Sequence, residues 1–344
     1  MASHRRPKQQ SRARVTVLTT AAAAAVVLSA NAANAAPSQK LSKDQVKAKV
    51  DELYQQAEQA SEKYDGAKDK QQKLQKEIST IQDNVARGQE DLNKLRDGLG
   101  SLATSQYRSG GIDPSVQLFL SSNPDDFLDK ASTLDQLSAQ QVDALKKIQD
   151  KQRELAQERA EATEKLKDLS ATRTELEQNK KKIQAKLADA QKILNTLTAK
   201  EKADLAAQQA RADRSASARV DLGNSTPASG RAGAAFAAAQ SVIGSPYVYG
   251  ASGPSSFDCS GLTSWAYAQA GVSIPRTSEA QATIGTRISS INDLQVGDLV
   301  FFYGDIHHVG LYAGNGQVLH APHTGAVVRY EAISDMPFQF GVRV

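Results

Sequence analysis

The chain has 344 residues, enough for about two domains, and only 5% of them are aromatic, which argues against one packed globule throughout. Its formal net charge is +4, but residues 1–35 hold five basic residues and no acidic one. Subtracting these five leaves −1 for the remainder, so the charge gives no support to nucleic-acid binding and no nucleic-acid partner is predicted.

Residues 1–35 have the pattern of a signal peptide. Basic residues precede an apolar run from Val15 to about Ala30, and Ala33-Asn34-Ala35 offers a cleavage site. A membrane anchor is the alternative, but a run of about 16 residues is short for a membrane span. We therefore predict that the protein is secreted to the extracellular side or the cell wall.

Two long amphipathic helices are predicted next, over residues 44–108 and 127–214. Apolar residues recur in steps of three and four through most of both segments, with charged and amide side chains between them and no proline. Each series is longer than the three to four heptads that identify a coiled coil. We expect polar side chains to interrupt the seam between the helices at five positions: Gln71, Gln152, Arg159, Arg173 and Lys180.

The segment 109–126 is rich in glycine and proline and predicts an irregular tip that joins the two helices into an antiparallel hairpin over residues 40–214. A parallel homodimer is the alternative, because heptads alone do not fix strand direction. The tip also carries apolar side chains, which either close the hairpin or form a docking patch for a partner. Residues 215–233, rich in serine, alanine and glycine, are predicted to form a flexible linker.

Residues 234–344 differ in composition, with most of the aromatic residues and short strands punctuated by glycine. Helices are predicted over 234–243, directly after Asp258 and after Pro275. The strands predicted to follow are 298–302, 308–313, 317–321, 326–330 and 340–344. Helices followed by an antiparallel sheet indicate an α+β domain.

Cys259 is the only cysteine of the chain and is predicted to lie in the first turn of a helix, where free N–H groups and the helix dipole favour a thiolate. A lone cysteine is often a small buried hydrophobe. An exported free thiol is exposed to oxidation, however, so its presence points to a function.

A nucleophilic thiolate needs a base and a group that holds the base. His308 and His320 each lie at the edge of an apolar segment, and Gly314-Asn315-Gly316 between them is a strong hairpin signal. Adjacent antiparallel strands would place the two imidazoles side by side, so one could take the thiol proton while the other orients it. Zinc is the alternative, but no short ligand spacing occurs and no metal is predicted.

Together these motifs resemble the NlpC-type peptidoglycan endopeptidases, which are papain-like cysteine peptidases. The resemblance covers residues 234–344 and rests on the following segments in order: 247–250 (YVYG), 258–262 (DCSGL), 275–278 (PRTS), 296–302 (VGDLVFF), 308–312 (HVGLY) and 319–321 (LHA). It implies a papain-like α+β fold with Cys259 as nucleophile, His308 as general base and His320 as the orienting residue. It implies no cofactor.

The resemblance also implies residues that meet the substrate. Tyr247 matches the tyrosine beside the nucleophile, whose hydroxyl could serve the oxyanion or the substrate carbonyl. Asp258 and Ser260 match positions that line the cleft and meet the amine of the stem peptide. Arg276 matches a loop residue suited to a substrate carboxylate, with a surface salt bridge as the alternative. The implied substrate is the peptidoglycan stem peptide, cut between D-glutamate and a diamino acid through an acyl-enzyme.

The helical arms are similar to those of secreted actinobacterial and Gram-positive hydrolases of this type, most specifically at 107–114 and 122–125. In similar division proteins the coiled coil contacts a division complex of ABC-transporter type and can cover the catalytic groove. A regulatory and docking arm is therefore expected. His307 and His323 match no functional position and are expected to be exposed.

Two other functions stay open. One is an amidase or acyltransferase that acts on cell-wall peptides with a papain-like fold. The other is a structural or activator protein with a silent catalytic domain, against which the intact Cys259, His308 and His320 argue.

Overall fold

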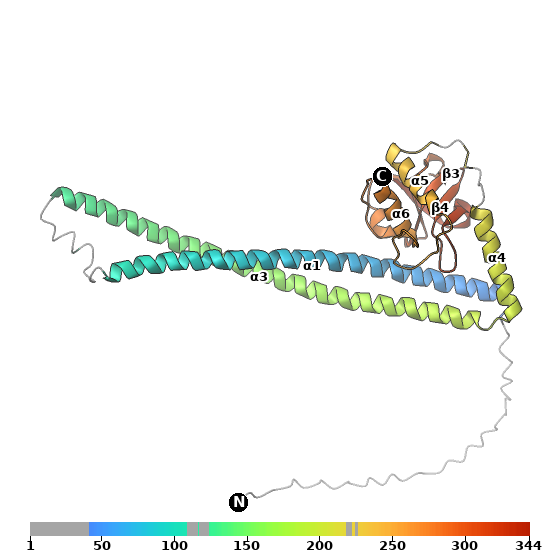
Figure 1. Cartoon of the computed structure of the whole chain (residues 1–344), viewed down its shortest axis with the longest axis horizontal. Coiled ribbons are helices and arrows are strands. Elements are labelled where there is room, and N and C mark those ends of the chain that lie inside the picture. The colour runs from blue at the N-terminus through green and yellow to red at the C-terminus, as the bar shows by residue number, and fades with distance from the viewer. Residues whose placement is uncertain (1–40, 109–115, 117–123, 218–221, 224–225) are drawn as a thin grey trace, which may run out of the picture. The chain divides into compact units, whose positions relative to one another are not determined.

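The computed structural model describes residues 41–108, 116, 124–217, 222–223 and 226–344 (Figure 1). The predicted signal peptide lies outside these residues, as do most of the predicted tip and part of the predicted linker. None of the helices described is long and apolar enough to cross a membrane.

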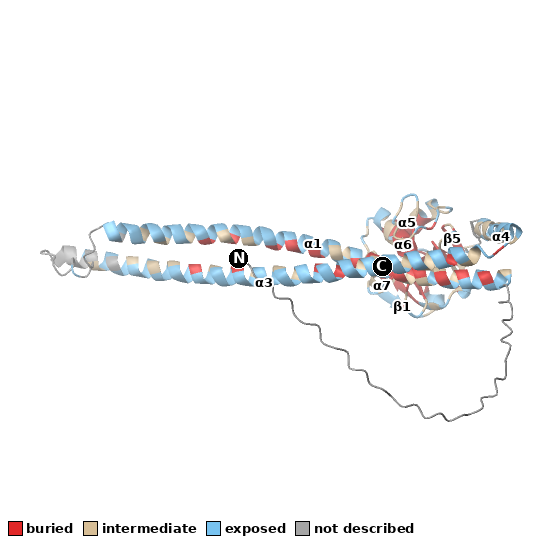
Figure 2. Cartoon of the chain, turned by 90° about the horizontal axis from the view of Figure 1, so that it is seen from below, coloured by how far each residue is buried: buried red, intermediate tan, exposed pale blue. Residues whose placement is uncertain are grey.

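The predicted antiparallel hairpin of long helices is confirmed. Helix α1 (Lys43–Arg108) begins with a reciprocal cap, in which the Ser42 N–H donates to Gln45 Oε1 and the Gln45 N–H donates to Ser42 Oγ. It packs antiparallel against α3 (Pro124–Leu194), and Figure 2 shows buried residues recurring along both helices. The buried apolar residues of α1 are Val46, Val50, Leu53, Ala57, Ala60, Ala67, Leu74, Ile78, Ile81 and Leu92.

The polar positions of the seam differ from the prediction. Only Gln71 is half-buried among the five expected positions. The other four are exposed: Gln152, Arg159, Arg173 and Lys180. Thr172 and Asn179 are buried instead, with 1% and 3% of their surface exposed. A strict seven-residue repeat drifts by about 20° per heptad relative to a straight α-helix, so the buried stripe of α3 has moved to the neighbouring residue.

The second arm is two helices, and its prediction as one arm over 127–214 is wrong in this respect. Helix α3 ends at Leu194, and α4 (Ala199–Ser217) starts after a turn. Thr198 caps α4: its N–H donates to Glu201 Oε2 at 2.7 Å, while the Glu201 N–H donates to Thr198 Oγ1 at 3.3 Å. This capping box satisfies orphan N–H groups of the new helix and fixes its start.

The C-terminal part is an α+β domain, as predicted. Its helices are α5 (Gly230–Ser241), α6 (Cys259–Gln269) and α7 (Ser278–Gln281). Its strands are β1 (Thr286–Ile288), β2 (Leu299–Phe302), β3 (His308–Gly314), β4 (Gln317–His320), β5 (Arg329–Ala332) and β6 (Phe338–Arg343). They form one antiparallel sheet in the order β1-β6-β2-β3-β4-β5. Strand β1 was not predicted, because three residues are too few to show an alternation, and α5 starts inside the predicted linker.

The sheet has an apolar core on each side. Along β2, Leu299 and Phe301 join the larger core, which also contains Phe236 of α5 and Leu262 and Tyr267 of α6. The alternate residues of β2 pack in a second core with side chains of β3, β4 and the turn after β5. Because α6 is held against the sheet by its buried side chains, its first turn is fixed relative to the strand ends.

Candidate active site

Cys259 is the first residue of α6, and its neighbours fix it there. Asp258 caps the helix, because its Oδ1 accepts the Gly261 N–H at 2.7 Å and its Oδ2 accepts the Gly250 N–H at 2.8 Å. Gly261 has no room for a side chain: a Cβ atom there would lie 2.1 Å from the carbonyl oxygen of Ala251. The thiol therefore sits at the positive end of the helix dipole, in the turn that the sequence predicted.

The two predicted histidines meet at one end of the β3–β4 hairpin. His308 opens β3 and His320 closes β4, and His308 Nε2 lies 2.7 Å from His320 Nδ1. Gly310 permits this approach, since a Cβ atom there would lie 2.4 Å from Val318 Cγ2 and 3.0 Å from the Cβ of His320. Both imidazoles are buried. The structure thus joins a helix-terminal thiol and a histidine pair, as the sequence predicted.

A carboxylate of the long helix α1 completes this cluster, and sequence reasoning missed it. Glu58 Oε1 lies 2.6 Å from His308 Nδ1, the ring nitrogen that His320 leaves free. The Cys259 sulfur, a ring nitrogen of His308 and a Glu58 oxygen all lie within 4.8 Å of one another. Such a set has metal-ligand chemistry, but the ion pair between Glu58 and His308 already accounts for it, and we assign no metal to the site.

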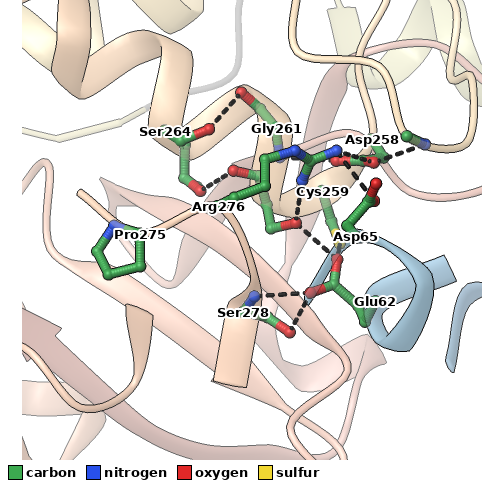
Figure 3. A network of polar contacts seen from close by, with 12 residues as sticks. Glu62, Asp65, Asp258, Cys259, Gly261, Ser264, Pro275, Arg276 and Ser278 are labelled. Atoms are coloured by element: carbon green, nitrogen blue, oxygen red, sulfur yellow. Dashed lines mark hydrogen bonds and ion pairs between the residues drawn. The ribbon is translucent and has the colours of Figure 1, made fainter. Parts of the chain in front are cut away.

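One helical turn further along α1, Glu62 also enters the site (Figure 3). Its Oε1 accepts the Ser260 hydroxyl at 2.6 Å and lies 3.6 Å from the Cys259 sulfur. Its Oε2 accepts both the N–H and the hydroxyl of Ser278, at 2.7 and 2.9 Å. The start of α7 and the first turn of α6 therefore hold a carboxylate between them, in what we call the carboxylate pocket.

Asp65, the next acidic residue on this face of α1, meets Arg276. The guanidinium donates to Asp65 Oδ2 at 3.1 Å, to Asp258 Oδ2 at 2.6 Å and to Ser260 Oγ at 2.8 Å (Figure 3). The three α1 acids follow one another at spacings of four and three residues, so they share one face of the helix. That spacing was visible in the sequence, but a solvated charged stripe has the same pattern.

Comparison with known proteins agrees with this geometry. Residues 244–341 match the NlpC/P60 family. They form an NlpC/P60 domain.

Two relatives match about a third of this chain. A probable endopeptidase of Corynebacterium glutamicum is 51% identical over 117 residues, which cover 34% of this chain and 56% of the relative. Probable endopeptidase p60 of Listeria monocytogenes is 50% identical over 100 residues, covering 28% of this chain and 20% of the relative. The chain thus spans about half the length of the first relative and less of the second.

Among solved structures, the crystal structure of the NlpC/p60 domain of the peptidoglycan hydrolase SagA is 37% identical. The match covers 33% of this chain and 98% of that one, with a TM-score of 0.31.

The α1 carboxylates change the protonation of the NlpC/P60 site. Burial raises the pKa of the Cys259 thiol well above its usual value, and the nearby Glu58 and Glu62 charges raise it further. Burial alone would lower the pKa of His308, but the ion pair with Glu58 outweighs it and the pKa is raised. With α1 in place, the cysteine is therefore held as a thiol, and His308 binds a proton more tightly than it would without Glu58.

Two of the α1 carboxyl groups, Glu62 and Asp65, have raised pKa values. Burial is the main cause that raises the pKa of Glu62 to about 8, and the charge of Asp258 adds to it. Burial raises the pKa of Asp65 to about 6, although Arg276 opposes the shift. Both groups therefore hold protons more tightly in the site than they would in water.

Tyr247 lies in the same site with an unused hydroxyl. The side chain is buried, and its hydroxyl has no hydrogen-bond partner among the residues that the structure describes. Its ring packs edge-on against Tyr249 with the ring centroids 5.1 Å apart. Burial raises the pKa of Tyr247 well above its usual value, so the hydroxyl keeps its proton and can donate it.

Two histidines expected to be exposed are not. His307 is buried: its ring stacks on Tyr303, its Nδ1 pairs with Asp305, and its carbonyl oxygen lies 3.7 Å from the Cys259 sulfur. His323 is half-buried and stacks on Tyr54 of α1, with the ring centroids 5.9 Å apart. The prediction failed because an aromatic neighbour in the same β2–β3 loop covers His307, and one on a helix more than 200 residues away covers His323.

Proposed function

We propose that the NlpC/P60 domain hydrolyses the stem peptides of peptidoglycan with Cys259 as nucleophile. One observation carries the proposal: the helix-terminal thiol lies within reach of His308, whose far nitrogen is held by His320. The similarity to proteins named endopeptidases supports the reaction class. The solved NlpC/p60 domain of a peptidoglycan hydrolase supports the substrate class.

The side chains suggest the following steps. His308 Nδ1 accepts the proton of the Cys259 thiol, and the thiolate attacks the carbonyl carbon of the scissile amide. The Tyr247 hydroxyl donates to the oxyanion that forms. His308 then gives its proton to the leaving amine, and a thioester to Cys259 remains. His308 next takes a proton from water, whose hydroxide attacks the thioester and releases the acid and the thiol.

The bond we propose is the one between D-glutamate and the diamino acid. This substrate has free carboxylates, and two features of the site already hold carboxylates that α1 supplies. The pocket of Ser260 and Ser278 binds Glu62, and Arg276 binds Asp65. Mass spectrometry of digested muropeptides tests the bond, because cleavage there leaves a diamino acid with a new free amine. Products of an amidase or acyltransferase would differ from this pattern.

We further propose that α1 restrains the domain. Its Glu58 occupies the nitrogen that must accept the thiol proton, and its acidic face raises the pKa of the thiol. Both effects oppose formation of the thiolate, and Glu62 also fills the carboxylate pocket. If residues 230–344 alone hydrolyse stem peptides no faster than the chain lacking only residues 1–35, restraint by the arm is wrong.

The remaining predictions concern location and partner. We propose export through residues 1–35, with action in the cell wall, and release of the arm by a membrane division complex that docks at the tip, residues 109–126. N-terminal sequencing of the exported protein tests the first, since cleavage after Ala35 leaves Ala36 as the first residue. Loss of co-purification with the division complex after deletion of the tip tests the second.

A further inference from the structure

Behind the histidine pair lies a carboxylate that neither the sequence motifs nor the proposed steps use. His320 Nε2, on the side of the ring away from His308, lies 3.2 Å from Glu331 Oε2 on β5. We propose that Glu331 is a positioning residue, which fixes His320 in the tautomer that accepts a hydrogen bond from His308. This proposal rests on the proposed function, because the proton transfer it supports is that of the thiol.

The argument follows the protons along the ring nitrogens. A neutral His308 that is to accept the thiol proton at Nδ1 must carry its own proton on Nε2. That N–H points at His320 Nδ1, 2.7 Å away, which must therefore be the acceptor. A neutral His320 then carries its proton on Nε2. Glu331 faces this atom, and an ionised carboxylate can only accept, so it selects this tautomer and disfavours the other.

The strand geometry holds Glu331 in place. In the β4–β5 ladder Arg329 pairs with His320, and Glu331 pairs with Val318, which lies two residues before His320. His320, Arg329 and Glu331 therefore lie on one face of the sheet. Arg329 Nη2 and Nε donate to Glu331 Oε2 at 2.9 and 3.3 Å, the same oxygen that faces His320. Glu331 Oε2 is thus held in place by two N–H groups of Arg329 on one side and by the imidazole of His320 on the other.

The charges of this group agree with its role. Burial alone would raise the pKa of Glu331, but His320 and Arg329 outweigh it and hold the pKa well below its usual range. Burial, aided by the proximity of His308 and Arg329, lowers the pKa of His320 to about 4. Near neutral pH Glu331 is therefore an anionic acceptor, and His320 is a neutral imidazole with one proton. Which ring nitrogen carries that proton decides whether His320 Nδ1 can accept from His308.

A purely structural role is the competing explanation. Arg329 Nη1 also donates to Asp213 of α4 at 2.7 Å, so Glu331 could serve only to brace Arg329 as a link between β5 and the helical arm. In that case loss of Glu331 would weaken the fold or the docking of α4 and leave the state of the His320 ring unchanged. The two roles therefore differ in the protonation of one ring nitrogen.

The parent for the test is the full chain lacking residues 1–35 and carrying Glu58→Ala, which frees His308 Nδ1 for the thiol proton. Glu331→Ala and Glu331→Gln are made in this parent. Long-range ¹⁵N spectra of histidine-labelled protein report which nitrogen of His320 carries the proton. The parent and Glu331→Gln should show protonated Nε2, since the amide oxygen stays turned toward Arg329. Glu331→Ala should show a mixture of tautomers. Arg343→Met, which removes an ion pair to Asp298 elsewhere in the sheet, is the matched control.

The kinetics of stem-peptide hydrolysis are the second measurement of the role of Glu331. We expect Glu331→Ala to lower kcat by about 10- to 100-fold, as loss of an outer-shell partner typically does, with KM within about twofold. Glu331→Gln should recover most of kcat, and Arg343→Met should match the parent.

The proposal is overturned if Glu331→Ala keeps the parent tautomer, or if Glu331→Gln is as slow as Glu331→Ala. It is also overturned if Arg343→Met reproduces the loss. If the parent does not hydrolyse stem peptides, the proposed function fails and the tautomer measurement alone decides the role of Glu331.

Discussion

The acidic face of α1 predicts that the arm leaves the active site as the pH rises. Docked, Glu62 has a pKa of about 8, because its burial and the neighbouring Asp258 outweigh its hydrogen bonds and the charge of Arg276. Released into water, its pKa returns to about 4.3. The docked arm therefore holds one more proton than the free arm throughout the interval between these values.

The sign and size of the effect follow from this difference. A carboxyl group with a raised pKa favours docking fully below the free pKa, and this contribution is lost as the pH climbs through the docked pKa. Docking weakens by about 1.4 kcal/mol per pH unit for one proton, hence by about 2.7 kcal/mol from pH 5.5 to 7.5. That is about a 100-fold rise in the ratio of open to docked arms. His308, whose pKa is raised by Glu58, shifts the balance in the same direction.

Energy transfer between two dyes measures the docking. Introduced cysteines at the exposed positions Lys70 on α1 and Glu279 on α7 carry the dyes, in a chain where Cys259→Ala removes the native thiol. Transfer should fall between pH 5.5 and 7.5. Glu62→Gln should flatten the titration by about one proton and keep the arm docked at higher pH. Transfer that rises or stays constant over this range, or an unchanged slope in Glu62→Gln, would refute the reasoning.

Three further predictions follow from single contacts. Glu58→Ala removes the ion pair to His308, so stem-peptide hydrolysis at pH 7 should rise at least about tenfold, the equivalent of about 1.4 kcal/mol of docking free energy. Glu52→Ala, which removes an exposed acid on the same helix, should leave the rate of hydrolysis unchanged. Tyr247→Phe should lower kcat by about 100-fold with KM nearly constant; a raised KM with unchanged kcat would instead indicate a role in binding. Thr198→Ala should destabilise the start of α4 by about 1 kcal/mol, seen as faster amide exchange in the first turn of α4 and unchanged exchange in α6.

The sequence predicted where Cys259, His308 and His320 lie because the signals that place them are local. Asp258 and Gly261 define the start of α6 within four residues, and the glycine-flanked Asn315 turn sets the register that brings His308 and His320 together. The long hairpin was predictable for a related reason, since periodicity alone reveals which face of a helix is buried. Its break before α4 was also readable, in the capping box of Thr198.

The site residues that were not predicted depend on which face of one helix or strand packs against an element far away in the chain. Glu58, Glu62 and Asp65 lie on an ordinary charged stripe until the site, about 200 residues later, covers them. Glu331 became part of the histidine cluster only through the pairing of β5 with β4, and the sequence prediction had placed that strand at 326–330. Spacing within one segment does not carry such information.

The measurement that tests the account most directly is mass spectrometry of muropeptides digested by the chain lacking residues 1–35 and carrying Glu58→Ala. The account predicts fragments cut between D-glutamate and the diamino acid, and none when Cys259→Ala is added. Release of intact stem peptides from the glycan, or cleavage that persists without Cys259, would contradict it.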